Sequence, residues 1–208
     1  MAKRKTKSPD EIAMSKIDEE FHGESDRIVA IVGGAYFDAL LESLLQSVFI
    51  REQAEEDLLS ASGPLGSNGS RYKLAYCLGL IRKHQRDDLR YVAKIRNEFA
   101  HNYTSLSFDD APVRDWCSNL QQAQFLDTLR AAASRNKVKM SPFTLSLSEG
   151  GDPITVEGFI KSLTETPRHR FTTTVVTLAG SLLRRINLVS RKDENTWFSK
   201  NPDRHLPI

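Results

Sequence analysis

Three polar side chains that could take part in catalysis stand in close succession: Arg96, Asn97 and His101. A histidine with an ordinary pKa of about 6.5 can accept or donate a proton at neutral pH. A guanidinium offers a planar pair of donors to two phosphate oxygens, and an amide can orient either group. These residue types suit metal-independent cleavage of RNA, in which the ribose 2′-hydroxyl attacks the neighbouring phosphate. The Arg-x4-His spacing alone is common by chance, so the surrounding elements must decide its meaning.

The helix that must carry these residues is amphipathic. Its apolar face contains Leu89 and the residues within about 80° of it on a helical wheel, which are Val92, Ala93, Phe99, Ala100 and Tyr103. Arg96 falls in the middle of this face, where an unpaired buried guanidinium would cost several kcal/mol. Arg96 therefore needs a carboxylate partner or a polar cleft. His101 lies about 140° from Arg96 on a regular helix, so both reach one phosphate only if the helix ends near Ala100 or a second subunit supplies one of them.

Asp38 and Glu42 are the candidate partners of Arg96. With Gln46 they recur every four residues along an apolar helix predicted over 25–50, and so form one polar stripe. In one interpretation this stripe faces Arg96 and supports a reactive site, and in another it lies at a solvated edge. A third interpretation is purely structural, with Arg96 pairing to a carboxylate to hold the helices in register and His101 capping a helix end.

Four further basic residues are candidate contacts to nucleic acid: Arg71, Arg82, Lys83 and Arg86. The last three cluster just ahead of the Arg96 helix, although most such clusters are solvated faces. The glycine-rich loop 63–69 precedes a helix predicted from Ser70, and it either holds an anion on free N–H groups or only connects two helices. It lacks the Gly-Lys-Ser/Thr of a P-loop. The net charge of +2 gives no global attraction to nucleic acid, so any contact would use local patches.

The sequence resembles two related groups of helical proteins. The run Arg96-Asn97-x-Phe99-Ala100-His101 resembles the Arg-x4–6-His motif of the HEPN superfamily, which includes toxin and antiphage ribonucleases. A wider match resembles the mannitol operon repressor family. It is carried by Ser25-Asp26-Arg27, Gly34 to Glu42, Pro64-Leu65-Gly66, Arg71 to Ile81, Asp88-Leu89, Leu106 to Asp110 and Arg168-x-Arg170-Phe171. This resemblance covers about residues 24–120 well and 166–186 loosely.

The resemblance implies two functions of different classes. The first is a dimeric regulatory protein that lowers gene expression through RNA or a protein partner, since no short basic recognition helix follows a tight glycine turn. The second is a metal-independent endoribonuclease, a toxin with an antitoxin or an antiphage protein, in which Arg96 and His101 of two subunits face each other across a homodimer. The stretch 131–165 and the C-terminal tail depart from the repressor pattern, which favours a specialised partner or a defence role.

Periodicity and helix breakers predict an all-α fold, a HEPN-like helical bundle. The expected helices cover 9–21, 25–50, 52–60, 70–79, a segment ending near Ala100, 110–120, 121–133 and 167–183. A small β-hairpin is predicted near 137–158. The expected organisation is a disordered basic arm at 1–8, a single helical domain over 9–188 with an irregular insertion at 131–165, and a tail at 189–208.

The composition, 39% hydrophobic and 27% charged, is that of an ordinary soluble globular protein. No run of 18 apolar residues occurs, so the sequence predicts a cytoplasmic protein without a membrane contact. Cys77 and Cys117 lack metal spacing and a disulfide framework, and are expected to be packed thiols. No metal or cofactor is expected.

Overall fold

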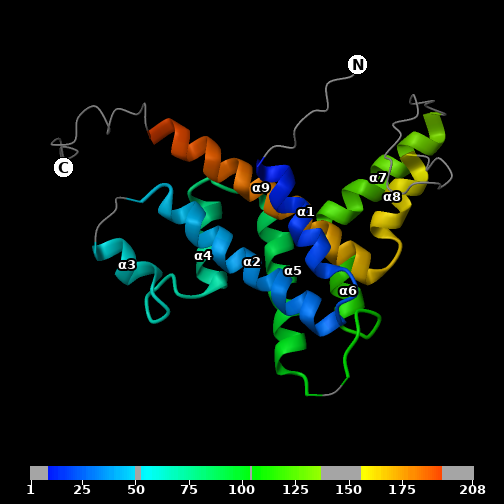
Figure 1. Ribbon diagram of the computed structural model, residues 1–208, viewed down its shortest axis with the longest axis horizontal. Coiled ribbons are helices and arrows are strands. Elements are labelled where there is room, and N and C mark those ends of the chain that lie inside the picture. The colour runs from blue at the N-terminus through cyan, green and yellow to red at the C-terminus, as the bar shows by residue number, and fades with distance from the viewer. Residues whose placement is uncertain (1–8, 50–52, 104, 137–155, 194–208) are drawn as a thin grey trace.

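Every regular element that the structure describes is an α-helix. This computed structural model describes residues 9–49, 53–103, 105–136 and 156–193 (Figure 1). Its helices are α1 (Pro9–Phe21), α2 (Asp26–Gln46), α3 (Gln53–Leu59), α4 (Asn68–Cys77), α5 (Lys83–His101), α6 (Val113–Ser118), α7 (Gln121–Asn136), α8 (Val156–Thr164) and α9 (Pro167–Asp193). The predicted all-α class is confirmed.

Local signals set most helix ends. The side chain of Ser25 accepts a hydrogen bond from the N–H of Ile28 and caps α2. Ser67 caps α4 in the same way, through the N–H of Ser70. Gly79 has a φ of +69°, the left-handed conformation that ends a helix and that glycine adopts without strain. The N-terminal cap of α2 and the turn at Gly79 lie at the predicted boundaries, whereas α4 begins two residues before the predicted start at Ser70.

Helix α2 is the centre of the bundle. It packs against α4, α5 and α9, and Figure 1 shows α5 running across it. By length and composition α2 could cross a membrane, but Phe37, Leu41 and Leu44 are fully buried inside this bundle. The apolar character of α2 is therefore explained by its neighbours.

Two adjacent glycines let α2 approach two helices at once. A Cβ on Gly33 would lie 3.0 Å from the ring of Phe171 in α9, and a Cβ on Gly34 would lie 2.5 Å from Cγ of Arg96 in α5. Consecutive helical residues point about 100° apart, so each glycine serves a different neighbour. Close packing thus compensates for the low helix propensity of this pair.

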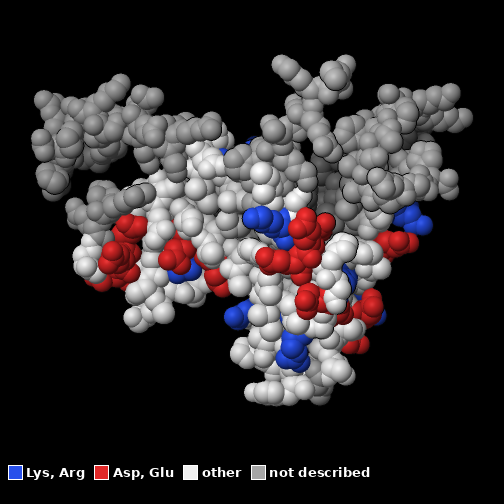
Figure 2. All heavy atoms as spheres, viewed as in Figure 1, with Lys and Arg blue, Asp and Glu red and all other residues white. Residues whose placement is uncertain are grey.

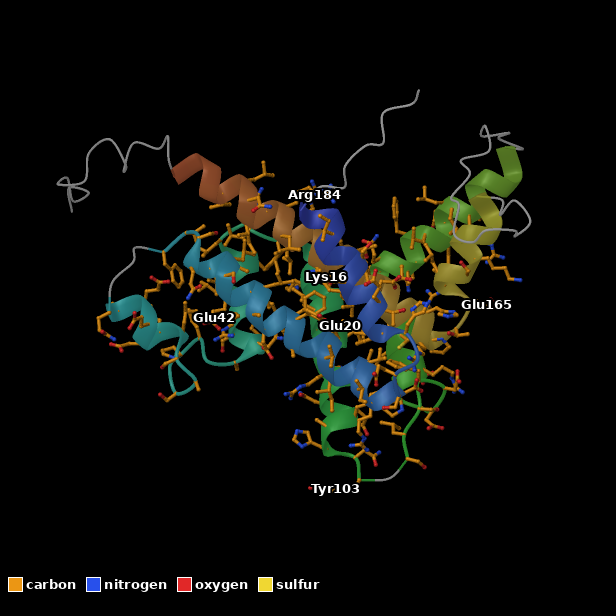
Figure 3. The ribbon with its side chains drawn as sticks, in the orientation of Figure 1. Lys16, Glu20, Glu42, Tyr103, Glu165 and Arg184 are labelled. Carbon is orange, nitrogen blue, oxygen red and sulfur yellow. The ribbon has the colours of Figure 1, made fainter. Side chains whose placement is uncertain are left out.

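Several sequence expectations need correction. Residues 156–158, assigned to the predicted hairpin, begin helix α8, while 137–155 lie outside the described residues. Helix α9 is longer than α2 and extends ten residues beyond the predicted end at 183. Tyr103, placed on the apolar face of α5, is 99% exposed beyond the end of that helix (Figure 3). The chain leaves the helix at His101, so the wheel no longer applies at 103.

Candidate ligand cleft

Many of the charged residues that carry the family resemblance hold helix ends together. Arg168, near the start of α9, pairs with the carboxylate of Asp26 and donates to the carbonyl oxygens of Phe21 and Glu24. The other oxygen of Asp26 accepts a hydrogen bond from the N–H of Phe108 at 3.0 Å. Asp26 therefore joins the start of α2 to α9 and to the loop after α5.

Arg27 caps the end of α5. Its guanidinium donates to the carbonyl oxygen of Phe99 at 2.8 Å and to that of Asn102 at 2.6 Å. The last carbonyl groups of a helix have no partner within it and carry partial negative charge, so a cation is favourable there. Arg27 thus fixes the end of the helix that carries Arg96 and His101.

Asp88 caps the other kind of helix end, the N-terminus of α7. Its two carboxylate oxygens accept hydrogen bonds from the N–H groups of Gln121 and Gln122, at 2.7 and 3.0 Å. Asp88 is 1% exposed, and burial raises the pKa of its carboxyl although these two hydrogen bonds oppose the shift. Its burial inside α5 was not predicted from the sequence.

Arg71 is largely buried. Its side chain donates to the carbonyl oxygens of Leu65, Asp38 and Leu59, and its guanidinium lies 3.1 Å from the carboxylate of Glu42. Figure 3 labels Glu42 on α2. With its donors used in this way and 7% of it exposed, Arg71 anchors the loop before α4. The sequence did not predict this structural role, and a contact of Arg71 with nucleic acid stays a prediction.

Glu42 is therefore the partner of Arg71, and the described structure contains no ion pair between Arg96 and either Glu42 or Asp38. Arg96 lies on the apolar face of α5 without a carboxylate partner of this kind among the described residues. Its aliphatic stem lies over Gly34, and its guanidinium donates to the amide oxygen of Asn97 at 3.1 Å. The stem is packed while the charged end reaches a polar cleft, as long basic side chains commonly do.

This cleft, the α5 cleft, has a volume of about 530 Å³ and lies between α2, the start of α4 and α5. Its charged and amide lining includes Asp38, Asn68, Arg71, Arg90, Lys94, Arg96 and Asn97, together with the loop Gly66–Gly69. The structure thus brings together Arg96, Asn97 and Asp38 of the predicted site. It adds Arg90 and Lys94, whose signal in the sequence was their four-residue spacing from Arg86 along one helix.

Arg90 and Lys94 have aromatic neighbours. Arg90 lies 5.2 Å from the ring centre of Tyr91, and Lys94 lies 5.7 Å from that of Trp116. Within the described parts of the chain, no carboxylate forms an ion pair with Arg90, Lys94 or Arg96. Asp38 is the acidic residue of the cleft lining. The cleft therefore has an excess of positive charge.

His101 does not line this cleft. It is the last residue of α5 and is exposed to solvent, next to the helix end that Arg27 caps. The helix ends at His101, one residue past Ala100, but this end does not bring His101 into the cleft beside Arg96. Within one chain, the Arg-x4-His motif is divided between a cleft and an exposed helix terminus.

The cluster at the start of α5 lies elsewhere. Arg82 lines a second hollow of about 380 Å³ with Arg184 and Arg185 of α9. Lys83 is exposed as the first residue of α5, and Arg86 pairs with Asp87 at 2.6 Å. Burial would raise the pKa of the Asp87 carboxyl, but the hydrogen bond and charge of Arg86 lower it. The role of Arg82, Lys83 and Arg86 in binding nucleic acid stays a prediction.

On the face shown in Figure 2, acidic and basic side chains are interspersed, and no continuous basic field is present. This agrees with the net charge of +2. An anionic ligand would therefore be attracted by a local feature such as the α5 cleft.

Comparisons with known protein sequences agree on one family. A family model described as mannitol repressor matches residues 25–150. The mannitol operon repressors of Escherichia coli strains K12 and O6:H1 CFT073 are each 35% identical over 60 residues, which cover 29% of this chain. Those 60 residues span 31% of the length of each curated relative. The structure described as the X-ray structure of the MtlR-HPr complex from Escherichia coli aligns with a TM-score of 0.48 and 20% identity, over 87% of this chain and 98% of that one.

Proposed function

Because the chain belongs to the mannitol repressor family, we propose that it is a negative regulator of gene expression that acts in the cytoplasm through a protein partner. In this proposal the protein binds and performs no chemistry of its own. The observation that carries it is the family match over 25–150, which contains every residue that lines the α5 cleft.

The arrangement of the charged residues supports a binding role. Arg27, Asp88 and Arg168 are used to fix helix ends, which makes the bundle a rigid support. Arg90, Lys94 and Arg96 of the α5 cleft lie outside these networks and are available to a ligand or partner. Arg96 lines the cleft, whereas His101 lies at the exposed end of α5. This separation does not favour a ribonuclease site within one chain.

The regulatory proposal is tested by deleting the gene in its host and measuring transcripts of hexitol-uptake genes. We expect the deletion to raise these transcripts several-fold and the wild-type gene to restore them. A complementing Arg82→Gln variant tests the cluster ahead of α5, and Lys73→Gln, an exposed change on α4, is its matched control. Unchanged transcripts in the deletion strain would contradict the proposal.

A second measurement separates regulation from cleavage. Purified wild type and His101→Ala are incubated with mixed cellular RNA in EDTA, after light scattering has established their oligomeric state. We expect no cleavage by either protein. Cleavage by the wild type that is lost in His101→Ala, with cyclic-phosphate ends, would make the ribonuclease the better account. The homodimer implied by the HEPN resemblance stays a prediction that the same light-scattering measurement tests.

A further inference from the structure

We propose that the α5 cleft binds a small phosphomonoester that also carries hydroxyl groups, the chemical class of sugar and polyol phosphates. Only the role of this compound as the effector of the regulator rests on the proposed function. The binding itself follows from the charge, the unsatisfied polar groups and the size of the cleft.

The charge of the cleft calls for an anion. Arg90 and Lys94 are exposed cations one helical turn apart on α5, and the guanidinium end of Arg96 enters the same cleft. Like charges at this spacing repel one another, and no described carboxylate neutralises them as an ion pair. A phosphate dianion relieves the repulsion and accepts charge-assisted hydrogen bonds from all three.

The start of α4 adds uncharged donors on the opposite wall. Ser67 caps this helix of ten residues, and its loop Gly66–Gly69 lines the cleft. The first N–H groups of a helix have no carbonyl partner within it, and the positive end of the helix dipole lies there. A Cβ on Gly69 would meet nothing closer than 3.8 Å, so this wall is open to a ligand.

The hydroxyl groups of the ligand are inferred from acceptors in the same cleft. The amide oxygen of Asn68 is buried and has no hydrogen-bond partner, a condition that costs free energy until a donor arrives. The phosphate group of a monoester dianion supplies only acceptors, so a hydroxyl group elsewhere on the ligand must donate to this oxygen. The carboxylate of Asp38 is a second acceptor in the lining. Ligand hydroxyl groups donate to both, while the cations hold the phosphate.

The size of the cleft favours a small molecule. Its volume of about 530 Å³ lies within the range of about 300–1,000 Å³ that is typical of small-ligand sites. An inorganic phosphate alone would leave much of this space to water. A phosphorylated protein segment or an RNA chain would reach the same cations, and both are outcomes of the test below.

The test is calorimetric titration of the purified full chain with mannitol 1-phosphate, inorganic phosphate and mannitol in turn. We expect mannitol 1-phosphate to bind at least tenfold more tightly than either of the other two compounds. Equal binding of mannitol 1-phosphate and inorganic phosphate would overturn the proposal, as would the absence of binding by mannitol 1-phosphate. Tight binding of an RNA oligonucleotide or a phosphopeptide without the small ligand would overturn it in favour of a macromolecule.

The variant Lys94→Gln removes one cation from an exposed position, and Lys73→Gln removes an exposed cation of α4 that does not line the cleft. We expect Lys94→Gln to weaken mannitol 1-phosphate binding about tenfold or more, and Lys73→Gln to leave it unchanged. Circular dichroism shows whether both remain folded. Equal effects of the two variants would overturn the location of the site. Binding by the purified chain and transcript levels in the host can fail independently, so this test is distinct from that of the regulatory function.

Discussion

At the scale of single residues, the two cysteines have different surroundings, although the sequence predicted packed thiols at both positions. Cys77 is exposed at the end of α4, whereas Cys117 is fully buried. Burial raises the pKa of the Cys117 thiol to about 12. Because the thiolate is the reactive form, both access and ionisation are reduced at Cys117.

We therefore expect one thiol of the native protein to react with Ellman's reagent at pH 8, and two to react in denaturant. Cys77→Ser should abolish the native reaction, while Cys117→Ala should leave it unchanged. Rapid reaction of both thiols in the folded wild type would contradict the burial of Cys117.

Asp127 accepts a hydrogen bond from Thr164 at 2.8 Å and one from Arg170 at 2.6 Å. Burial alone would raise the pKa of its carboxyl, but these hydrogen bonds and the charge of Arg170 lower it below the ordinary value of 3.8. A carboxyl whose pKa is lower in the folded state stabilises the fold above its unfolded-state pKa. This stabilisation is lost as the pH falls through the folded-state pKa.

Asp127→Asn should lower the free energy of unfolding at pH 7 by about 1 kcal/mol or less, since the pair is partly exposed. The difference from wild type should shrink as the pH falls below 3.8. Urea unfolding at several pH values measures it. Asp115→Asn is the control, because Asp115 lies in an exposed pair 3.6 Å from Arg114. A difference that grows toward low pH would contradict the assigned role of Asp127.

At the scale of the helices, Gly34 determines how closely α2 and α5 approach. A Cβ at this position would lie 2.5 Å from Cγ and 2.9 Å from Cβ of Arg96. Two helices held by packed cores cannot both move away without losing other contacts. The contact also directs the Arg96 guanidinium into the α5 cleft.

Gly34→Ala should destabilise the protein by about 1–3 kcal/mol through this overlap, despite the better helix propensity of alanine. Combined with Arg96→Ala, which removes Cγ but keeps Cβ, the loss should be smaller than the sum of the two single losses. Thermal and urea unfolding of the four proteins measure this coupling. Gly69→Ala is the control with an open position, and strict additivity of the two losses would contradict the close contact.

At the scale of the whole molecule, Asp26 connects three parts of the chain that are distant in sequence. It pairs with Arg168 of α9, accepts from the N–H of Phe108, and is the first residue of α2. The rings of Phe99, Phe108 and Phe171 form a core cluster, with ring centres 5.1 Å apart and the rings tilted in each adjacent pair. This junction holds α2, α9 and the loop after α5 together.

Asp26→Ala should therefore lower the free energy of unfolding by roughly 1–3 kcal/mol, because it removes the carboxylate partner of Arg168 and leaves the N–H of Phe108 without its acceptor. Chemical denaturation measures the loss. Glu165→Gln, which breaks an exposed pair with Lys161, should change stability by less than about 0.5 kcal/mol. A loss no greater in Asp26→Ala than in this control would show that the junction is dispensable.

The sequence by itself determined the local structure of this protein. Helices begin near Ser25 and Ser67 and turn at Gly79 because caps and glycine conformations depend on a few consecutive residues. The burial of Leu89 and Phe99 on one side of α5 followed from helical periodicity. The resemblance to the mannitol operon repressor family could also be read from residues alone, and the family match confirms it.

Only the tertiary structure decided which charges pair and which remain available. Glu42 meets Arg71 and not Arg96, and Asp88 reaches the start of α7, 33 residues away in the chain. Such partners are chosen by how helices cross, and a one-dimensional pattern contains no distance between separate helices. The grouping of Arg90, Lys94 and Arg96 beside the loop before α4 depends on the same crossings.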